Sequence, residues 1–458
     1  MPHRSVPTSD GIVVTRLAPN DQTLQVSFRS GEKLSGARFF AEVRENDVLI
    51  LRQEVDSCNF VLTGLPNGRD CSLRIVAEDG GGTLLAQSCD RWFRTNFVPG
   101  VVVAYLHPAD HTYVDSGNTT CSPSICRLDN GELLVSHDFF RSKGGQHLTH
   151  LYRSRDNGAT WEFASAISPC FWGSLFTHRG AVYLLCTSTE YGALQIYRST
   201  DGGEHWEGPV KLLEAGSREA GGPHKAPMAV IAHGGRLWTA VEFGSWDTEM
   251  HCPGAVSADE NADLMDPTSW VCTGFLPYDA AKLPEISGHP RGGTIEGNLL
   301  VTPDGELVDL LRFSTRLCQP SYGKAYLTRV TAPDQLMEFV STVDFPGNLS
   351  KFFILQSPAD GRYYALSNPV TGENLLQRNV LRLSVSDDLL HWTTVRDILN
   401  YEDNCFCEDS KKVGFQYPSF IFDGDDILAA VRTALNGAEN FHNANHITFH
   451  RIRNYRKQ

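Results

Sequence analysis

The sequence lacks a long apolar segment and an excess of basic residues. No run approaches the roughly 18 apolar residues of a membrane-spanning helix. The 40 Lys and Arg residues are outnumbered by 54 Asp and Glu, which gives a net charge of −14. A nucleic-acid binder needs a basic face, so we expect neither a nucleic-acid nor a membrane partner. An anionic small substrate stays compatible, because a local arginine cluster can override the global sign.

Paired cysteine spacing is also absent. The 12 cysteines are scattered, and Cys405 and Cys407 form the only close pair. A disulfide framework or a zinc site would show tighter paired spacing, and the adjacent His251 and Cys252 would chelate one ion poorly. We therefore expect reduced cysteines, no metal and no cofactor. The first residues contain no apolar signal segment, which predicts a cytoplasmic protein, or a secreted one if this is a mature form.

Two turn motifs are the most informative feature present. Residues 154–161 and 199–206 both read S-x-D-x-G-x-x-W. In a tight turn the Asp accepts backbone N–H groups, the Gly supplies a positive φ, and the Trp packs beneath. The pair resembles the Asp box of sialidase-like β-propellers, whose repeats recur every ~40–50 residues. The box stabilises a turn, so it indicates the fold and carries no chemistry.

The strand pattern predicts two all-β domains. Residues 1–97 contain alternating stretches such as 24–28 and 73–77, and they resemble a fibronectin type III β-sandwich. Pro99-Gly100 is predicted to be the linker between the two domains. Residues 98–458 alternate turns with apolar strands, and division by the box spacing predicts a catalytic propeller of seven blades, with six as the alternative.

Polar and aromatic residues at the ends of apolar strands are candidates for a central site, because a propeller gathers such residues around its channel. Each also has a structural alternative, such as a turn histidine or an internally paired arginine. The substrate-binding candidates selected this way are Trp172, Tyr191, Glu296, Arg312, Tyr417, Arg432 and His442.

A sialidase would have an arginine triad that begins with an Arg-Ile-Pro-like segment near the first blade, together with a Tyr–Glu nucleophile pair. No Arg-x-Pro of that kind stands near residue 110. The box motif alone therefore does not establish sialidase activity.

A second set of short sequence motifs is distributed over residues 100–455. It includes Ser122-Pro123-Ser124-Ile125, Ser136-His137-Asp138, 175–180 and 414–417. Together they resemble the seven-bladed propeller enzymes that act on rhamnose–glucuronate linkages, namely rhamnose-α-1,4-glucuronate lyases, some first described as rhamnosidases, and the more distant ulvan lyases. The catalytic residues that this resemblance implies are His137, Arg198 and His224. Two further family positions have His111 and Arg236 as their nearest matches, and we include both as substrate-binding candidates.

Elimination across C4–C5 of a uronate needs a cation that neutralises the carboxylate, a base for H5 and an acid for the leaving oxygen. Arginine binds a carboxylate through two hydrogen bonds, and histidine titrates near neutrality. The sequence thus favours an exo-acting lyase on a uronate-containing oligosaccharide or polysaccharide. A glycoside hydrolase of the rhamnosidase or sialidase type, which needs two acidic groups, is the first alternative. A non-catalytic glycan-binding propeller is the second.

Overall fold

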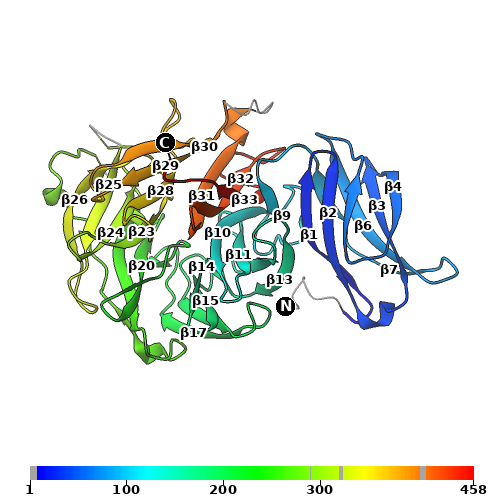
Figure 1. Ribbon diagram of the computed structural model, residues 1–458, viewed down its shortest axis with the longest axis horizontal. Coiled ribbons are helices and arrows are strands. Elements are labelled where there is room, and N and C mark those ends of the chain that lie inside the picture. The colour runs from blue at the N-terminus through cyan, green and yellow to red at the C-terminus, as the bar shows by residue number, and fades with distance from the viewer. Residues whose placement is uncertain (1–7, 289, 319–322, 403–408, 458) are drawn as a thin grey trace.

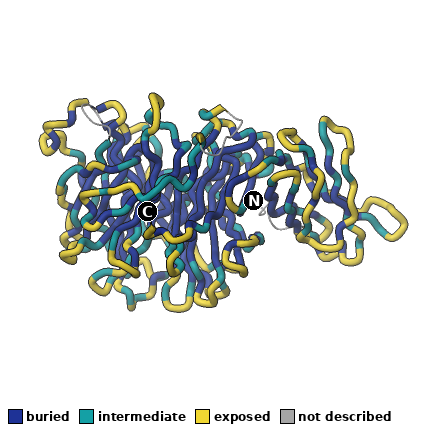
Figure 2. The backbone as a smooth tube through the Cα atoms, turned by 45° about the horizontal axis from the view of Figure 1, so that its top comes forward, coloured by how far each residue is buried: buried dark blue, intermediate teal, exposed yellow. Residues whose placement is uncertain are grey.

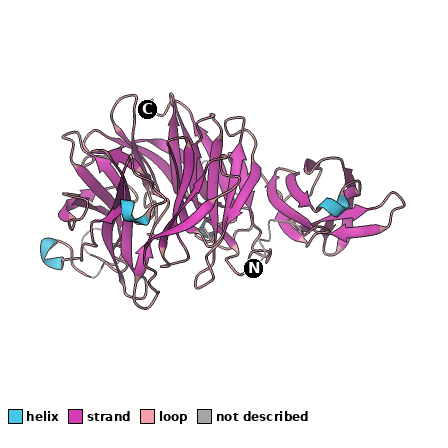
Figure 3. Cartoon of the chain, turned by 90° about the horizontal axis from the view of Figure 1, so that it is seen from below, coloured by secondary structure: helices cyan, strands magenta, loops and turns pink. Residues whose placement is uncertain are grey.

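The computed structural model describes residues 8–288, 290–318, 323–402 and 409–457 (Figure 1). It is an all-β protein, as predicted, with an N-terminal β-sandwich followed by a β-propeller (Figure 3). Within these ranges the helical segments are four 3₁₀ turns: Glu32–Leu34, Pro267–Ser269, Ala280–Lys282 and Ser410–Lys412. None of the described helices is long and apolar enough to cross a membrane. The ten described cysteines are free, and Cys405 and Cys407 lie outside the described residues.

The sandwich consists of two antiparallel sheets, ordered β1-β2-β5 and β4-β3-β6-β7, with β8 also paired to β6. Its strands are β1 (Ile12–Asn20), β2 (Thr23–Ser30), β3 (Arg38–Glu45), β4 (Val48–Val55), β5 (Asn59–Thr63), β6 (Asp70–Glu78), β7 (Leu84–Gln87) and β8 (Arg91–Arg94). Alternate residues of β2 and β6 face inward, and Leu24, Val26, Leu73 and Ile75 are almost completely buried. The alternating pattern in the sequence therefore corresponds to half-buried strands.

The remaining described residues form six sheets arranged around a central axis, and buried residues fill the strands (Figure 2). Blades 1 and 2 contain β10 (Thr119–Arg127), β11 (Leu133–Phe140), β12 (Thr149–Ser154), β13 (Glu162–Ile167), β14 (Phe171–His178), β15 (Ala181–Thr187), β16 (Leu194–Ser199) and β17 (Glu207–Leu213). Blades 3 and 4 contain β18 (Gly222–His224), β19 (Ile231–His233), β20 (Arg236–Ser245), β21 (Met250–Asp259), β22 (Trp270–Cys272), β23 (Thr294–Val301), β24 (Leu307–Phe313), β25 (Lys324–Arg329) and β26 (Glu338–Asp344).

Blades 5 and 6 complete the propeller. They contain β27 (Phe353–Gln356), β28 (Tyr363–Ser367), β29 (Val380–Ser386), β30 (Thr393–Asn400), β31 (Gly414–Asp423), β32 (Asp426–Ala434), β33 (His446–Ile452) and, as the outermost strand, β9 (Val101–Tyr105). Pairing of β9 with β33 joins the start of the propeller to its end and closes the ring. The described residues thus match the six-blade alternative rather than seven blades. The blades are longer than the box spacing suggested, because long loops connect their strands.

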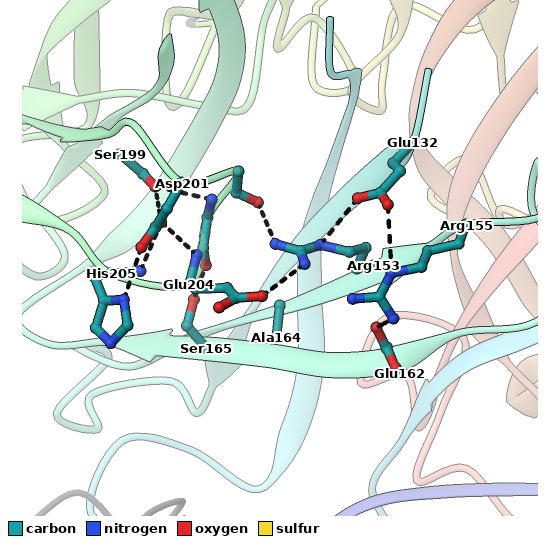
Figure 4. Close-up of polar contacts among 12 residues, drawn as sticks. Glu132, Arg153, Arg155, Glu162, Ala164, Ser165, Ser199, Asp201, Glu204 and His205 are labelled. Atoms are coloured by element: carbon teal, nitrogen blue, oxygen red, sulfur yellow. Dashed lines mark hydrogen bonds and ion pairs between the residues drawn. The ribbon is translucent and has the colours of Figure 1, made fainter. Parts of the chain in front are cut away.

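Both Asp boxes form the expected turns at the outer side of blades 1 and 2. Asp156 accepts the backbone N–H of Thr160 at 2.8 Å. Asp201 accepts those of Glu204 and His205 at 3.1 and 3.0 Å, as Figure 4 shows for this second turn. Burial of Asp201 opposes ionisation, but the hydrogen bonds from His205 outweigh it and hold the pKa of the carboxyl below its usual range. His205 is therefore structural. In the degenerate box of blade 5 the capping carboxylate is Asp388.

Replacing Asp156 or Asp201 by alanine is expected to destabilise the fold by about 1 kcal/mol each, because each change removes a turn cap. The ionised Asp201 carboxylate stabilises the fold at pH values above the usual aspartate pKa. This stabilisation is lost as the pH falls, because the pKa of Asp201 is lower in the folded protein than in the unfolded chain. Thermal unfolding measures the stability. Loss of turnover at an unchanged melting temperature would contradict a purely structural role.

The sandwich contacts the propeller through buried polar groups. Arg91 of β8 pairs with Asp110 of the propeller at 2.5 Å, and both side chains are almost completely buried. Arg16 of β1 donates to the carbonyls of Val102 and Val103 in β9, at 2.6 and 2.8 Å. The sandwich therefore covers the outer strand that closes the ring, which does not fit a free linker at residues 99–100.

Replacing Arg91 by methionine is expected to destabilise the protein by about 3–5 kcal/mol, because Asp110 is left buried without its partner. The double variant with Asp110→Leu is expected to recover part of that loss. The same contacts predict that removal of residues 1–97 yields an unstable or insoluble propeller. Melting temperatures of the three variants test this, and a truncated propeller that unfolds at the wild-type temperature would refute it.

Candidate active site in the central channel

A repeated backbone irregularity directs side chains into the channel. In four inner strands the register breaks around one residue with positive φ: Ser122 in β10, Trp172 in β14, Glu296 in β23 and Tyr417 in β31, with φ between 44° and 61°. A bulge of this kind redirects a side chain out of the regular alternation. Positive φ at a non-glycine residue costs energy and concentrates at functional sites.

The residue two positions later joins each of these strands to the next blade. Its side-chain oxygen accepts a backbone N–H from the innermost segment of the neighbouring blade. The four hydrogen bonds are Leu175 N to Ser124 at 2.9 Å, Met228 N to Ser174 at 3.0 Å, Ile354 N to Asn298 at 2.9 Å and Ile125 N to Ser419 at 3.3 Å. These bonds fix the inner strands relative to one another and hold the channel residues rigidly.

The channel opens into a cavity of about 470 Å³, and all six blades contribute to its wall. This volume is within the range of small-molecule sites. Among its lining residues are Cys121, Ser122, Phe140, Trp172, Glu190, Arg218, His224, Trp246, Asp247, Arg291, Glu296, Arg312, Arg316, Arg378, Tyr417, Arg432 and His442. Cations outnumber carboxylates in this set although the whole chain is acidic, so the cavity wall carries a local excess of positive charge.

Three arginines surround Tyr417. Arg312 donates to Glu296 at 3.0 Å and to the Tyr417 hydroxyl at 3.4 Å. The guanidinium carbons of Arg378 and Arg432 lie 5.4 and 5.2 Å from the centre of the Tyr417 ring. Any anion bound between these guanidinium groups therefore lies next to the tyrosine.

Two of the three arginines have no protein counter-charge. Within the described ranges, neither Arg378 nor Arg432 has a carboxylate within 4 Å, although both are at least 95% buried. Arg378 donates to the Gln416 side chain at 2.6 Å, and Arg432 contacts the Cys121 sulfur at 3.2 Å. The Nε atoms of both are buried without a partner. Burial lowers the pKa of Arg378 to about 10. Buried charges are normally paired, so these groups call for an anionic ligand.

Glu296 and Tyr417 form a base beside a phenol. Burial would raise the pKa of Glu296, but Arg312, His224 and a hydrogen bond with Tyr417 outweigh it and lower the pKa. Burial and the Glu296 charge raise the pKa of Tyr417. At neutral pH the carboxylate is therefore ionised and the phenol keeps its proton. This is the arrangement of a nucleophile with an adjacent base.

A second titratable pair faces the same cavity. His224 Nδ1 lies 2.7 Å from the Glu242 carboxylate, which also accepts the backbone N–H of Gly297 at 3.0 Å. The His224 ring lies 4.4 Å from that of Trp172. Glu242 fixes the ring orientation and directs Nε2 toward the cavity, as in a carboxylate-oriented catalytic histidine.

Seven of the residues predicted from sequence line this cavity together. They are His224, Trp172, Glu296, Arg312, Tyr417, Arg432 and His442. Burial and the nearby arginines hold the pKa of His442 well below its usual range, which keeps this ring neutral beside Arg432. Their catalytic and substrate-binding roles stay predictions.

The positions of His137 and Arg198 do not fit the predicted catalytic roles. His137 lies on the second strand of its blade, stacks on Tyr152 at 5.6 Å and is 99% buried outside the cavity. Burial lowers its pKa to about 4. Arg198 lies on the third strand of its blade, where it pairs with Glu207 at 2.6 Å. Arg312 and Arg432 also lie on second strands and do line the cavity. Whether a residue reaches the cavity therefore depends on its strand and its position along that strand, and neither can be read from the apolar run before it.

Three predicted substrate-binding residues also lie outside the cavity lining. His111 is exposed on a loop before β10. Tyr191 is fully buried behind Trp172, and its hydroxyl accepts the backbone N–H of Trp246 at 3.2 Å. Arg236 donates to the Ser257 hydroxyl at 3.0 Å at the outer end of β20. Tyr191 and Arg236 thus bond to other protein groups, and the role of all three residues in substrate binding stays a prediction.

Sequence reasoning missed several residues of the site. Arg378 precedes β29 in a loop and follows no apolar strand. Arg218 binds Glu190 at 2.7 Å and Asp247 at 3.2 Å at the rim. A signal was present in the triplets 122–124, 172–174, 296–298 and 417–419, which share Pro or Gly followed by Ser or Asn.

The fold and the site define a β-propeller protein with a charged central pocket. Residues 182–429, more than half of the chain, match the BNR repeat-like domain family, so the protein belongs to this family. No curated protein matches the chain.

Several solved propeller enzymes resemble the structure. The Hadza microbial sialidase Hz136 is 14% identical, with a TM-score of 0.52, 98% of this chain and 94% of that chain covered. The Penicillium chrysogenum α-L-arabinanase complexed with arabinobiose is 14% identical, with a TM-score of 0.51 and coverage of 79% and 99%. The Ruminococcus gnavus intramolecular trans-sialidase in complex with oseltamivir carboxylate is 12% identical, with a TM-score of 0.51 and coverage of 77% and 96%. At such identities the likeness establishes the fold.

Proposed function

We propose that the protein is an exo-acting glycoside hydrolase that removes a carboxylate-bearing sugar from a glycan. The observation that carries this proposal is the Tyr417–Glu296 pair, set among three buried arginines of which two lack a protein counter-charge. A carboxylate bound by Arg378 and Arg432 lies beside the Tyr417 ring. The acid group of the substrate is therefore expected on or next to the reacting carbon, as in a 2-keto acid sugar.

In the proposed first step the Tyr417 oxygen attacks the anomeric carbon while Glu296 takes the phenol proton. A tyrosine nucleophile is a recognised exception to the usual carboxylate pair of glycosidases. A neutral phenol also approaches an anionic sugar without the repulsion that a carboxylate nucleophile would meet. The three guanidinium groups hold the substrate carboxylate throughout.

His224 is the group that we assign to the leaving oxygen. As an imidazolium it gives a proton to the departing sugar, and as a neutral ring it then takes one from the attacking water. The water oxygen bonds to the anomeric carbon, and the tyrosine oxygen leaves and regains its proton from Glu296. Glu242, bonded to His224 Nδ1 at 2.7 Å, stabilises the charged ring.

Elimination on a rhamnose–glucuronate glycan is the second candidate. It is supported by the same His224–Glu242 pair, which offers a base for H5 beside a carboxylate held by arginine. Two of the three catalytic residues implied by the lyase resemblance, His137 and Arg198, lie outside the cavity. The hydrolase therefore ranks first. The sandwich, which resembles fibronectin type III, has a supporting role in either case.

A panel of 4-methylumbelliferyl glycosides tests the proposal. We expect release of the fluorophore from the N-acetylneuraminic acid glycoside, less from the glucuronide, and none from uncharged glucoside and arabinofuranoside. Glu296→Gln is the inactive control. A rhamnose-capped glucuronate oligosaccharide is tested in parallel for an ultraviolet-absorbing unsaturated product, which would establish elimination instead. Turnover of the uncharged sugars alone would refute an acidic substrate.

A further inference from the structure

Two buried lysines lie beside the inner strands: Lys225 directly follows β18 and Lys351 precedes β27. Each lies three residues before a backbone N–H that a side chain of the preceding blade accepts, Met228 N to Ser174 and Ile354 N to Asn298. Lys351 therefore belongs to the blade between the one that carries Glu296 and the one that carries Tyr417.

Lys351 contacts the backbone that carries the tyrosine. Its Nζ donates to the carbonyl of Pro418 at 2.5 Å, and Pro418 directly follows Tyr417 at the bulge. The side chain is fully buried and does not line the cavity. Its Nζ also lies 4.8 Å from the centre of the Phe353 ring, and within the described ranges no carboxylate approaches it within 4 Å.

The charge of Lys351 acts on Glu296. Burial lowers the pKa of Lys351 to about 7, and the Glu296 charge opposes that shift. The titratable and charged groups that interact with Glu296 are Arg312 on β24, His224 on β18, Tyr417 on β31, Cys121 on β10, Arg378 before β29 and Lys351 before β27. Lys351 also faces Lys225.

We propose that Lys351 is a positioning residue for the Tyr417–Glu296 pair. Its hydrogen bond to the Pro418 carbonyl fixes the bulge that aims the Tyr417 hydroxyl, and its ammonium favours the ionised form of Glu296. This inference rests on the proposed function for its kinetic consequences, whereas its electrostatic consequence is independent of any substrate.

The test is Lys351→Met, with Lys351→Gln as a second uncharged variant that keeps a hydrogen-bond donor. Both are expected to lower kcat, Met by about 10- to 100-fold, because a small displacement of a reacting group has an effect of that size. KM is expected to stay unchanged, since Lys351 does not touch the cavity. The acid limb of the kcat profile is expected to move to higher pH, because loss of a nearby positive charge raises the pKa of Glu296.

A second readout needs no turnover. In protein carrying ¹³C-carboxyl glutamate, the Glu296 signal, assigned with Glu296→Gln, is expected to titrate at higher pH in both Lys351 variants. Lys225→Met removes an equally buried ammonium that bonds instead to Ser174 and the Ala226 carbonyl, and it is expected to move the Glu296 titration less.

The outcomes separate the two proposals. A wild-type protein without turnover on acidic glycosides contradicts the proposed function, and the Glu296 titration still decides the role of Lys351. An unshifted Glu296 signal in the Lys351 variants, or equal shifts in the Lys225 and Lys351 variants, overturns the positioning role.

Discussion

Replacement of Tyr417 by phenylalanine is expected to lower kcat by roughly 10³-fold or more, because it removes the oxygen that bonds to the anomeric carbon. KM is expected to change little, since the ring stays between Arg378 and Arg432 and the carboxylate site is intact. Steady-state kinetics on the acidic glycoside and the melting temperature, measured on the same samples, test this expectation.

Tyr363→Phe is the matched control. Tyr363 is fully buried, and its hydroxyl donates to the Val301 carbonyl at 2.5 Å, away from the cavity. Its loss is expected to cost about 1 kcal/mol of stability and to leave kcat near the wild-type value. A Tyr417→Phe variant that keeps wild-type turnover would remove Tyr417 as the nucleophile and would favour elimination through His224.

The fold was largely predictable because its turns have specific chemical requirements. An Asp that accepts backbone N–H from its turn, a Gly with positive φ and a Trp packed against the core recur at 154–161 and 199–206. The number of blades was less predictable, because only two boxes are complete and the loops between strands vary in length. In the degenerate turn of blade 5, Asp388 still accepts a backbone N–H from Leu390, although the motif around it is incomplete.

The site was only partly predictable. The sequence around a polar residue that follows an apolar strand does not show which strand of the blade the residue belongs to. His137 and Glu296 both end or interrupt apolar strands, yet one lies on a second strand and the other on a first strand. The distinguishing feature is the bulge, whose Pro or Gly and Ser or Asn follow Glu296 but not His137. Tertiary neighbours such as Arg378 have no local signal at all.

The bulge of the first inner strand carries no arginine. Cys121-Ser122-Pro123 begins the bulge of the first inner strand, so a cysteine stands beside the cavity there. Arg432, from the last blade, reaches the Cys121 sulfur at 3.2 Å and supplies a third guanidinium group. Because a propeller closes on itself, the last blade lies next to the first. Residues of the first and last blades can therefore meet in one cavity although they lie far apart in the sequence.

Replacement of Arg378 by lysine is expected to raise KM by about 10²-fold or more, and methionine to raise it further, because neither side chain can bind a carboxylate through two hydrogen bonds. Arg432→Lys is expected to behave in the same way. Arg236→Lys, at the outer end of β20 and outside the cavity lining, is the charge-matched control and is expected to leave KM unchanged.

Replacement of Arg378 is expected to weaken substrate binding without lowering the thermal stability of the ligand-free protein. In the free protein Arg378 is a buried charge with no carboxylate within 4 Å in the described part of the chain, and burial already lowers its pKa to about 10. Removing such a charge relieves its desolvation cost, so the melting temperature of ligand-free Arg378→Met is expected to equal or exceed that of the wild type. An arginine that served only to hold the fold would show the reverse, a lower melting temperature with KM unchanged. The pairing of weaker binding with undiminished stability thus distinguishes an arginine kept for an anionic substrate from one kept for structure.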